Sequence, residues 1–102
     1  MAMVAVSIAP SGTGSASVSD YVAAALEVVR RDGRVRWELG PMFTTLEGDL
    51  TVCLELVAKM HETLAAMGAP RIGSVIKIDD RRDKPLTMSG KMEAVRRRLE
   101  NS

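Results

Sequence analysis

The chain has few of the residues that carry cross-linking or metal chemistry. Its 102 residues include one cysteine, Cys53, and one histidine, His61. A single cysteine excludes an intrachain disulfide, and together with one histidine it cannot form a zinc site built from several Cys and His ligands. We therefore expect neither a disulfide-stabilised domain nor a zinc-binding module. Aromatic residues are also few, at only 3% of the sequence.

The chain also lacks a strong net charge and a long apolar run. The formal net charge is +1 at pH 7, and this balance does not indicate a basic face for nucleic acid or an anionic membrane. No run approaches the roughly 18 apolar residues of a membrane span, and the first residues lack the basic segment of a signal peptide. With 46% hydrophobic and 26% charged residues, we expect one globular cytoplasmic domain over residues 1–102, with no metal or cofactor.

The hydrophobic spacing predicts four strands and three helices. Strands are expected at residues 3–9, 34–39, 42–47 and 71–78, and helices at about 18–31, 50–67 and 90–99. Ser17 and Asp49 are expected to cap the first two helices, and Gly68 to end the second. This order predicts an α+β fold of the ferredoxin-like βαββαβ type. Its antiparallel four-stranded sheet has helices on one face, and a C-terminal helix follows.

Each expected helix carries an apolar stripe that we predict to face inward. The stripes are Val18, Val22, Leu26 and Val29 in the first helix, Leu50, Cys53, Val57, Met60, Leu64 and Met67 in the second, and Met92, Val95 and Leu99 in the last.

The sheet face away from the helices is predicted to be mixed in character. Strand alternation assigns to this open face Ala5, Ser7, Arg36, Glu38, Phe43, Thr45, Glu47, Val75, Lys77 and Asp79. Such a face suits a second sheet packed against it, with polar residues around a small cavity. We therefore predict a homo-oligomer.

Seven short segments carry a pattern that extends over almost the whole chain. They are Ser7-Ile-Ala-Pro-Ser-Gly-Thr-Gly14, Ser17-Val-Ser-Asp-Tyr-Val22, Glu38-Leu-Gly-Pro-Met42, Glu47-Gly-Asp-Leu50, His61-Glu62, Gly68-Ala-Pro-Arg71 and Lys77-Ile-Asp-Asp-Arg-Arg-Asp-Lys-Pro85. In order and spacing they resemble the small single-domain members of the thiamine-binding, YkoF-like family.

The resemblance implies a ferredoxin-like subunit that dimerises through its sheets and commonly forms a homotetramer. It also implies binding of thiamine or its hydroxymethylpyrimidine part without catalysis, as a carrier, buffer or sensor. The sequence departs from the family at Phe43, where a glycine usually precedes the threonine that Thr44 matches.

Hydroxyls and carboxylates suit the edge of an aminopyrimidine and the thiazolium cation, and an aromatic ring suits the flat face. The expected platform is Phe43 or Trp37. Thr44 alternates to the other sheet face and is included for its match to the family. The predicted ligand-binding residues are Ser7, Glu38, Phe43, Thr44, Thr45 and Glu47.

Three further features have a structural interpretation beside a functional one. The segment Gly12-Thr-Gly14 is a tight connection or, alternatively, an anion cradle at a helix N-terminus. His61 is a structural hydrogen-bonding residue or a general base. Cys53 lies on an apolar stripe and is interpreted as a small core residue.

Six consecutive charges of mixed sign, 79–84, follow the last predicted strand. The adjacent Asp79 and Asp80 point to opposite faces of a strand, so they cannot act as one acid/base pair or metal clamp. We predict a salt-bridge network that supports oligomerisation and contains Lys77, Asp79, Asp80, Arg81 and Arg82. Because no nucleophile–base or metal constellation is present, we do not expect an enzyme. The alternative to ligand binding is a structural or protein-interaction oligomer with no small-molecule role.

Overall fold

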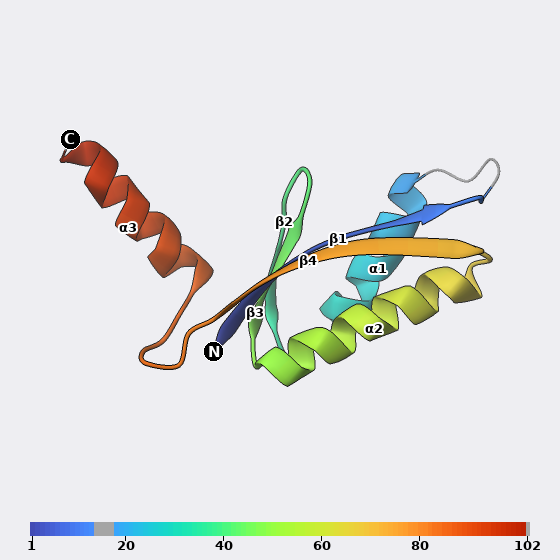
Figure 1. Ribbon diagram of the computed structural model, residues 1–102, viewed down its shortest axis with the longest axis horizontal. Helices are drawn as coiled ribbons and strands as arrows, with labels where there is room; N and C mark the ends of the chain where they lie inside the picture. The colour runs from blue at the N-terminus through green and yellow to red at the C-terminus, as the bar shows by residue number, and fades with distance from the viewer. Residues whose placement is uncertain (14–17, 102) are drawn as a thin grey trace.

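The computed structural model describes residues 1–13 and 18–101. Two helices lie on one face of a four-stranded sheet, and a third helix stands apart (Figure 1). The strands are β1 (Ala2–Ser11), β2 (Arg36–Leu39), β3 (Thr44–Gly48) and β4 (Arg71–Asp80), and the helices are α1 (Val18–Asp32), α2 (Leu50–Ala66) and α3 (Met88–Glu100). The predicted α+β order with a terminal helix is confirmed.

The sheet is antiparallel throughout, in the order β2-β3-β1-β4. β1 pairs with β4 along its whole length, from Ala2 opposite Asp80 to Ser11 opposite Arg71. Its pairing with β3 ends earlier, where Val6 lies opposite Thr44. Among the described residues, the remainder of β1 therefore has no strand beside it on the β3 side, and a cavity forms there.

The core lies between the sheet and the pair α1 and α2. Val4 of β1, Leu46 of β3 and Leu56 of α2 are completely buried within it. Burial of an aliphatic side chain of this size contributes about 1.5–3 kcal/mol to folding. These side chains fix which sheet face is covered, and so they define the other face as open.

The predicted limits of α2 are confirmed by its caps. The side chain of Asp49 accepts a hydrogen bond from the backbone N–H of Val52 at 3.2 Å. After the helix, Gly68 has φ +97° and donates to the carbonyl of Ala65 at 3.0 Å. The predicted inward position of Met67 is wrong, because this residue lies at the C-cap and is exposed. The predicted Ser17 cap lies outside the described residues.

The predicted stripe of α1 is only partly correct. Tyr21, Ala25 and Val29 are buried, whereas Val18 is exposed. The helix packs on α2 as well as on β1. Val29 belongs to both sets, so the buried face is turned by only about half a residue, roughly 50°, from the predicted stripe.

Local hydrogen bonds explain two shifted strand ends. β2 begins at Arg36, after the expected residue 34, because the side chain of Asp32 accepts from the backbone N–H of Arg34 at 3.2 Å. β3 begins after Phe43, because the carbonyl of Phe43 accepts from the backbone N–H of Gly40 at 2.9 Å and closes a turn. Phe43 therefore belongs to the turn, and its assignment to a strand is wrong.

The predicted inward packing of α3 is also wrong. Met92, Val95 and Leu99 are between 47% and 69% exposed, and α3 contains no buried residue. The segment between β4 and α3 carries the helix away from the body (Figure 1). As a result the radius of gyration is 15.3 Å, compared with about 13 Å for a compact domain of this length. Within the described part of the chain, no helix is long and apolar enough to cross a membrane.

Candidate functional site

The register confirms the predicted open face for the strand residues. Ala5 of β1 lies opposite Thr45 of β3 and Lys77 of β4, and Thr45 in turn lies opposite Glu38 of β2. Since α1 and α2 cover the other face, these side chains point away from the core. Trp37 alternates to the helix side and packs against the core, so its alternative role as a ligand platform is wrong.

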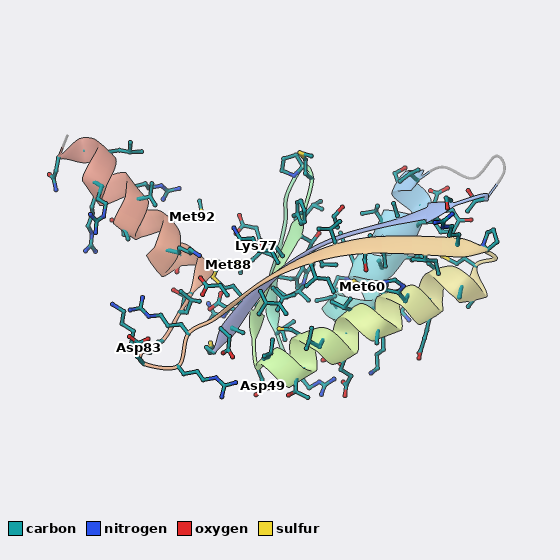
Figure 2. All side chains as sticks on the ribbon, in the orientation of Figure 1. Asp49, Met60, Lys77, Asp83, Met88 and Met92 are labelled. Carbon is teal, nitrogen blue, oxygen red and sulfur yellow. The ribbon has the colours of Figure 1, made fainter. Side chains whose placement is uncertain are left out.

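A cavity of about 240 Å³ lies on this open face, and we call it the open-face cavity. Glu38, Phe43 and Thr45 of the β2–β3 hairpin line one side of it. The opposite wall comes from α3, and Figure 2 shows Met88 and Met92 on the side of this helix nearer the sheet. The cavity therefore combines a carboxylate, a hydroxyl and an aromatic ring with flexible apolar side chains.

A second cavity of about 240 Å³ lies between α1, β1 and the turn that follows β2, and we call it the helix-side cavity. Its lining is mostly apolar, with contributions from Val22 and Leu26 of α1. Ser7 and Thr44 also line it, where β1 extends beyond its pairing with β3.

The six predicted ligand-binding residues thus do not share one cavity. Glu38 and Thr45 line the open-face cavity, Ser7 and Thr44 line the helix-side cavity, and Phe43 lines both. The sixth residue, Glu47, lines a neighbouring hollow with Glu38.

Glu47 is only 6% exposed because the start of α3 covers it. One oxygen of its carboxylate accepts a hydrogen bond from the backbone N–H of Met88 at 3.4 Å. Glu47 therefore helps to hold α3 over the open face. Sequence reasoning missed the contributions of Met88, Lys91 and Met92 to the cavity, although the four-residue spacing of the two methionines was an available signal.

The charges at the end of β4 and just after it form ion pairs within the chain. Nζ of Lys91 lies 2.7 Å from Oδ2 of Asp79 and lowers the pKa of this carboxyl. The other pairs are Arg82 with Asp80 at 2.9 Å, and Arg81 with Asp83 at 2.7 Å. Their predicted role between subunits stays a prediction, as does that of Lys77 on the open face.

The two residues weighed as nucleophile or base lie away from the open face. Nε2 of His61 is 2.8 Å from the hydroxyl oxygen of Ser74 and joins α2 to β4, as the structural interpretation predicted. Cys53 is completely buried in the core, and burial raises the pKa of its thiol. Among the described residues, no three His, Cys, Asp or Glu side chains gather to hold a metal ion.

The predicted glycine loop is only partly described. Gly12 has φ +72°, a backbone conformation that suits a tight connection. Gly14 lies outside the described residues, so an anion site at this loop stays an untested alternative.

The fold and the open sheet face define a small ferredoxin-like α+β protein. More particularly, the chain belongs to the thiamine-binding protein family, whose sequence profile matches residues 4–96. It is 39% identical over 103 residues to the UPF0045 protein YqgV of Bacillus subtilis, with 98% of this chain and 99% of the relative covered. It is 40% identical over 93 residues to a UPF0045 protein of Methanothermobacter thermautotrophicus, with 90% and 93% covered.

Two solved structures show the same fold. The hypothetical protein MJ1052 of Methanocaldococcus jannaschii superposes with a TM-score of 0.83 at 38% identity, over 92% of this chain and 94% of that one. TM0486 of Thermotoga maritima superposes with a TM-score of 0.76 at 21% identity, over 92% and 97% of the two chains. The name of TM0486 connects that protein with thiamine biosynthesis or salvage.

Proposed function

We propose that this protein binds thiamine or its hydroxymethylpyrimidine part without catalysis, in the open-face cavity and against a second copy of the chain. The observation that carries this proposal is the meeting of Glu38, Thr45 and Phe43 in one cavity on the uncovered sheet face. Membership of the thiamine-binding family supports the ligand class, and the name of the Thermotoga maritima neighbour points in the same direction.

The lining groups match the chemistry of this ligand. The carboxylate of Glu38 can accept hydrogen bonds from the amino group of the pyrimidine, and the hydroxyl of Thr45 can donate to a ring nitrogen. Phe43 is half-buried and offers an aromatic face to a flat ring. The aromatic residue by which this chain departs from its family therefore lies where it can stack on the ligand.

The size of the cavity supports completion by a second copy. Its volume of about 240 Å³ lies below the range of about 300–1,000 Å³ that encloses drug-sized ligands. One subunit therefore offers space for the pyrimidine ring, and a second sheet over the open face closes the site around the remainder. This arrangement requires only the homodimer through sheets predicted from the sequence. We further propose that this dimer is part of a homotetramer in the cytoplasm.

Lys91 distinguishes among thiamine compounds. Its side chain lines the open-face cavity and is held by Asp79. An ammonium group here repels the thiazolium cation and attracts the phosphate of a thiamine phosphate. We therefore expect the neutral pyrimidine or a phosphorylated thiamine to bind more tightly than thiamine itself.

The position of the reactive side chains supports binding rather than catalysis. Cys53 is buried among core residues, and His61 is occupied with Ser74 on the helix side of the sheet. The open-face cavity instead combines one carboxylate, one hydroxyl and one paired ammonium with apolar groups. A carrier, buffer or sensor role uses such a lining without a chemical step.

Calorimetric titration with thiamine, hydroxymethylpyrimidine and thiamine phosphate tests the proposal. Glu38→Gln removes the negative charge of the main hydrogen-bond acceptor. We therefore expect the Kd of this variant for the bound compound to be about tenfold higher than that of the wild type. The control is Glu62→Gln, which changes an exposed carboxylate on α2 and leaves the Kd unchanged.

Two results would contradict the proposal in different ways. If none of the three compounds gives binding heat at millimolar concentration, ligand binding is excluded. The remaining hypothesis is then a structural or protein-interaction oligomer with no small-molecule role. A Kd that rises for Thr44→Val but not for Glu38→Gln moves the site to the helix-side cavity. Sizing chromatography is a separate check, because a stable monomer contradicts a site closed by a second copy.

A further inference from the structure

A separate hollow lies on the open face, at the start of β4 and so at the opposite end of this strand from α3 (Figure 1). Its volume is about 450 Å³, and we call it the Arg71 hollow. Among the described residues, none lines both this hollow and the open-face cavity. The proposed function therefore leaves the Arg71 hollow without a role.

The register of β1 and β4 explains the shape of the Arg71 hollow. Its floor is formed by Ala9 of β1 and Gly73 of β4, which lie directly opposite each other. The next pairs on the same face, which form the two ends of the hollow, are Ser7 with Val75 and Ser11 with Arg71. Arg71 and Val75 are four residues apart, or about 13 Å along a strand. Two small residues between larger ones thus leave a depression with the length of a small molecule.

The end of the hollow at Arg71 carries hydrogen-bond donors that are available to a ligand. Within the described part of the chain, the guanidinium of Arg71 forms no ion pair or hydrogen bond, and the hydroxyl of Ser11 forms no hydrogen bond. No acidic side chain of the described residues lines the hollow. Because Ser11 lies directly opposite Arg71, their Cβ atoms are about 5 Å apart and both groups can reach one ligand. This end of the hollow therefore suits an anion.

We propose that the Arg71 hollow binds the phosphate group of a small phosphorylated alcohol. The planar guanidinium can donate two parallel hydrogen bonds to a phosphate, and the hydroxyl of Ser11 can donate a third. A phosphate monoester presents three terminal oxygens to these three donors, whereas a carboxylate presents two. The donor set therefore fits a phosphate better than a carboxylate.

The other end of the hollow fits the organic part of the ligand. Val75 is 62% exposed and offers apolar surface. Ser7, which lies opposite Val75, offers a hydroxyl that can donate or accept a hydrogen bond. Ser7 lies about 13 Å along β1 from Ser11, so the two hydroxyls cannot bind the same phosphate. We therefore expect a ligand with a short carbon chain over the floor and a hydroxyl at its far end.

This site goes beyond the proposed function, because it uses neither a pyrimidine nor the residues of the open-face cavity. It also differs from the anion cradle considered for the glycine loop, since its cation and its floor belong to paired strands. The β1–β4 ladder holds Arg71, Gly73 and Ala9 in place before any ligand binds. Such preorganisation lowers the entropic cost of binding.

Calorimetric titration with inorganic phosphate and with glycerol 3-phosphate tests the site. Arg71→Gln removes the charge and the paired donors, so we expect it to raise both Kd values about tenfold or more. Glycerol 3-phosphate should bind the wild type more tightly than inorganic phosphate, because it also contacts the floor. The control is Arg98→Gln, which removes the same group from an exposed position on α3 and should leave both Kd values unchanged.

Gly73→Val tests the shape of the hollow with every donor in place. A Cβ built on Gly73 meets no heavy atom within 4 Å, and Gly73 is not among the glycines with positive φ. Valine therefore fits the strand, and its side chain fills the floor of the hollow. We expect this variant to be folded by far-UV circular dichroism and to lose the preference for glycerol 3-phosphate.

Several results would overturn the proposal. No binding heat with either phosphate at millimolar concentration would do so, as would an Arg71→Gln variant with the wild-type Kd. Acetate that binds as tightly as inorganic phosphate would contradict a phosphate as the ligand. Loss of phosphate binding in Lys91→Gln rather than in Arg71→Gln would move the anion to the open-face cavity. A Gly73→Val variant that keeps the preference for glycerol 3-phosphate would show that the ligand does not occupy the hollow.

Discussion

Nζ of Lys91 donates a hydrogen bond to Oδ2 of Asp79 at 2.7 Å and thereby joins α3 to the end of β4. The second link is the backbone N–H of Met88, which donates to the carboxylate of Glu47. α3 has 13 residues, a length at which an isolated helix is marginal in water. The order of α3 therefore depends in large part on these two links.

The first prediction concerns the titration of Asp79. Because Lys91 lowers its pKa, we expect the carboxyl to titrate below about 3.9, the ordinary aspartate value. A carboxyl whose folded-state pKa is lowered stabilises the fold above the unfolded pKa, and this contribution is lost as the pH falls through the lowered value. The stabilisation is therefore fully present at neutral pH and disappears in acid.

NMR titration of carboxyl carbons measures this pKa directly. Lys91→Met should raise the pKa of Asp79 toward the ordinary value. Arg97→Met is the control, since Arg97 pairs with Glu93 inside α3 and should leave Asp79 unchanged. An Asp79 pKa that does not respond to Lys91→Met would show that the ion pair is not formed in solution.

The second prediction compares two leucines of α2. Leu56 is completely buried, whereas Leu54, two residues earlier, is 40% exposed. We expect Leu56→Ala to lower the free energy of unfolding by about 2–5 kcal/mol, because it leaves a cavity in the core. Leu54→Ala should change it by about 0.5 kcal/mol or less.

Urea unfolding at one fixed protein concentration measures both changes, because any self-association would make the measured stability depend on concentration. Equal losses for the two variants would contradict the assignment of the buried face of α2.

The third prediction concerns the turn that positions Phe43. A Cβ built on Gly40 would collide with the backbone oxygen of Phe43, which accepts the hydrogen bond of the turn. Gly40→Ala must therefore open the turn and displace the aromatic ring from the open-face cavity. We expect a loss of about 1–3 kcal/mol in unfolding free energy, together with weaker ligand binding.

Pro41→Ala is the matched control, because Pro41 is an exposed residue of the same turn. Thermal unfolding and calorimetric titration of both variants provide the readouts. Unchanged stability in Gly40→Ala would mean that the close approach between Gly40 and Phe43 does not persist in solution.

The local parts of the fold could be predicted from the sequence. The cap at Asp49 and the glycine turn at Gly68 depend on residues within one helical turn. Alternation along the strands likewise placed Glu38 and Thr45 on the open face, because the period of two fixes the side of a sheet. These features require no knowledge of distant contacts.

The predictions that failed concern how helices and strands are placed relative to one another. The apolar residues of α3 appeared to belong to the core, but the direction of the segment after Asp80 places them in water. Met88 and Met92 were therefore missed as lining residues of the open-face cavity. Ser7 lines the helix-side cavity because β1 outlasts its pairing with β3, a mismatch of strand lengths that periodicity does not show. Thr44 lines the same cavity, as its predicted alternation to the other sheet face implies.

The position of β1 bears on how the subunit forms during synthesis. β1 is made first, yet it lies between β3 and β4, and its pairing with β4 extends to Asp80. Until the ribosome has released that residue, β1 has one open edge, and the nascent chain can pair there with other strands. The sheet therefore cannot be completed before β4 has been made, and β1 keeps an unpaired edge until then.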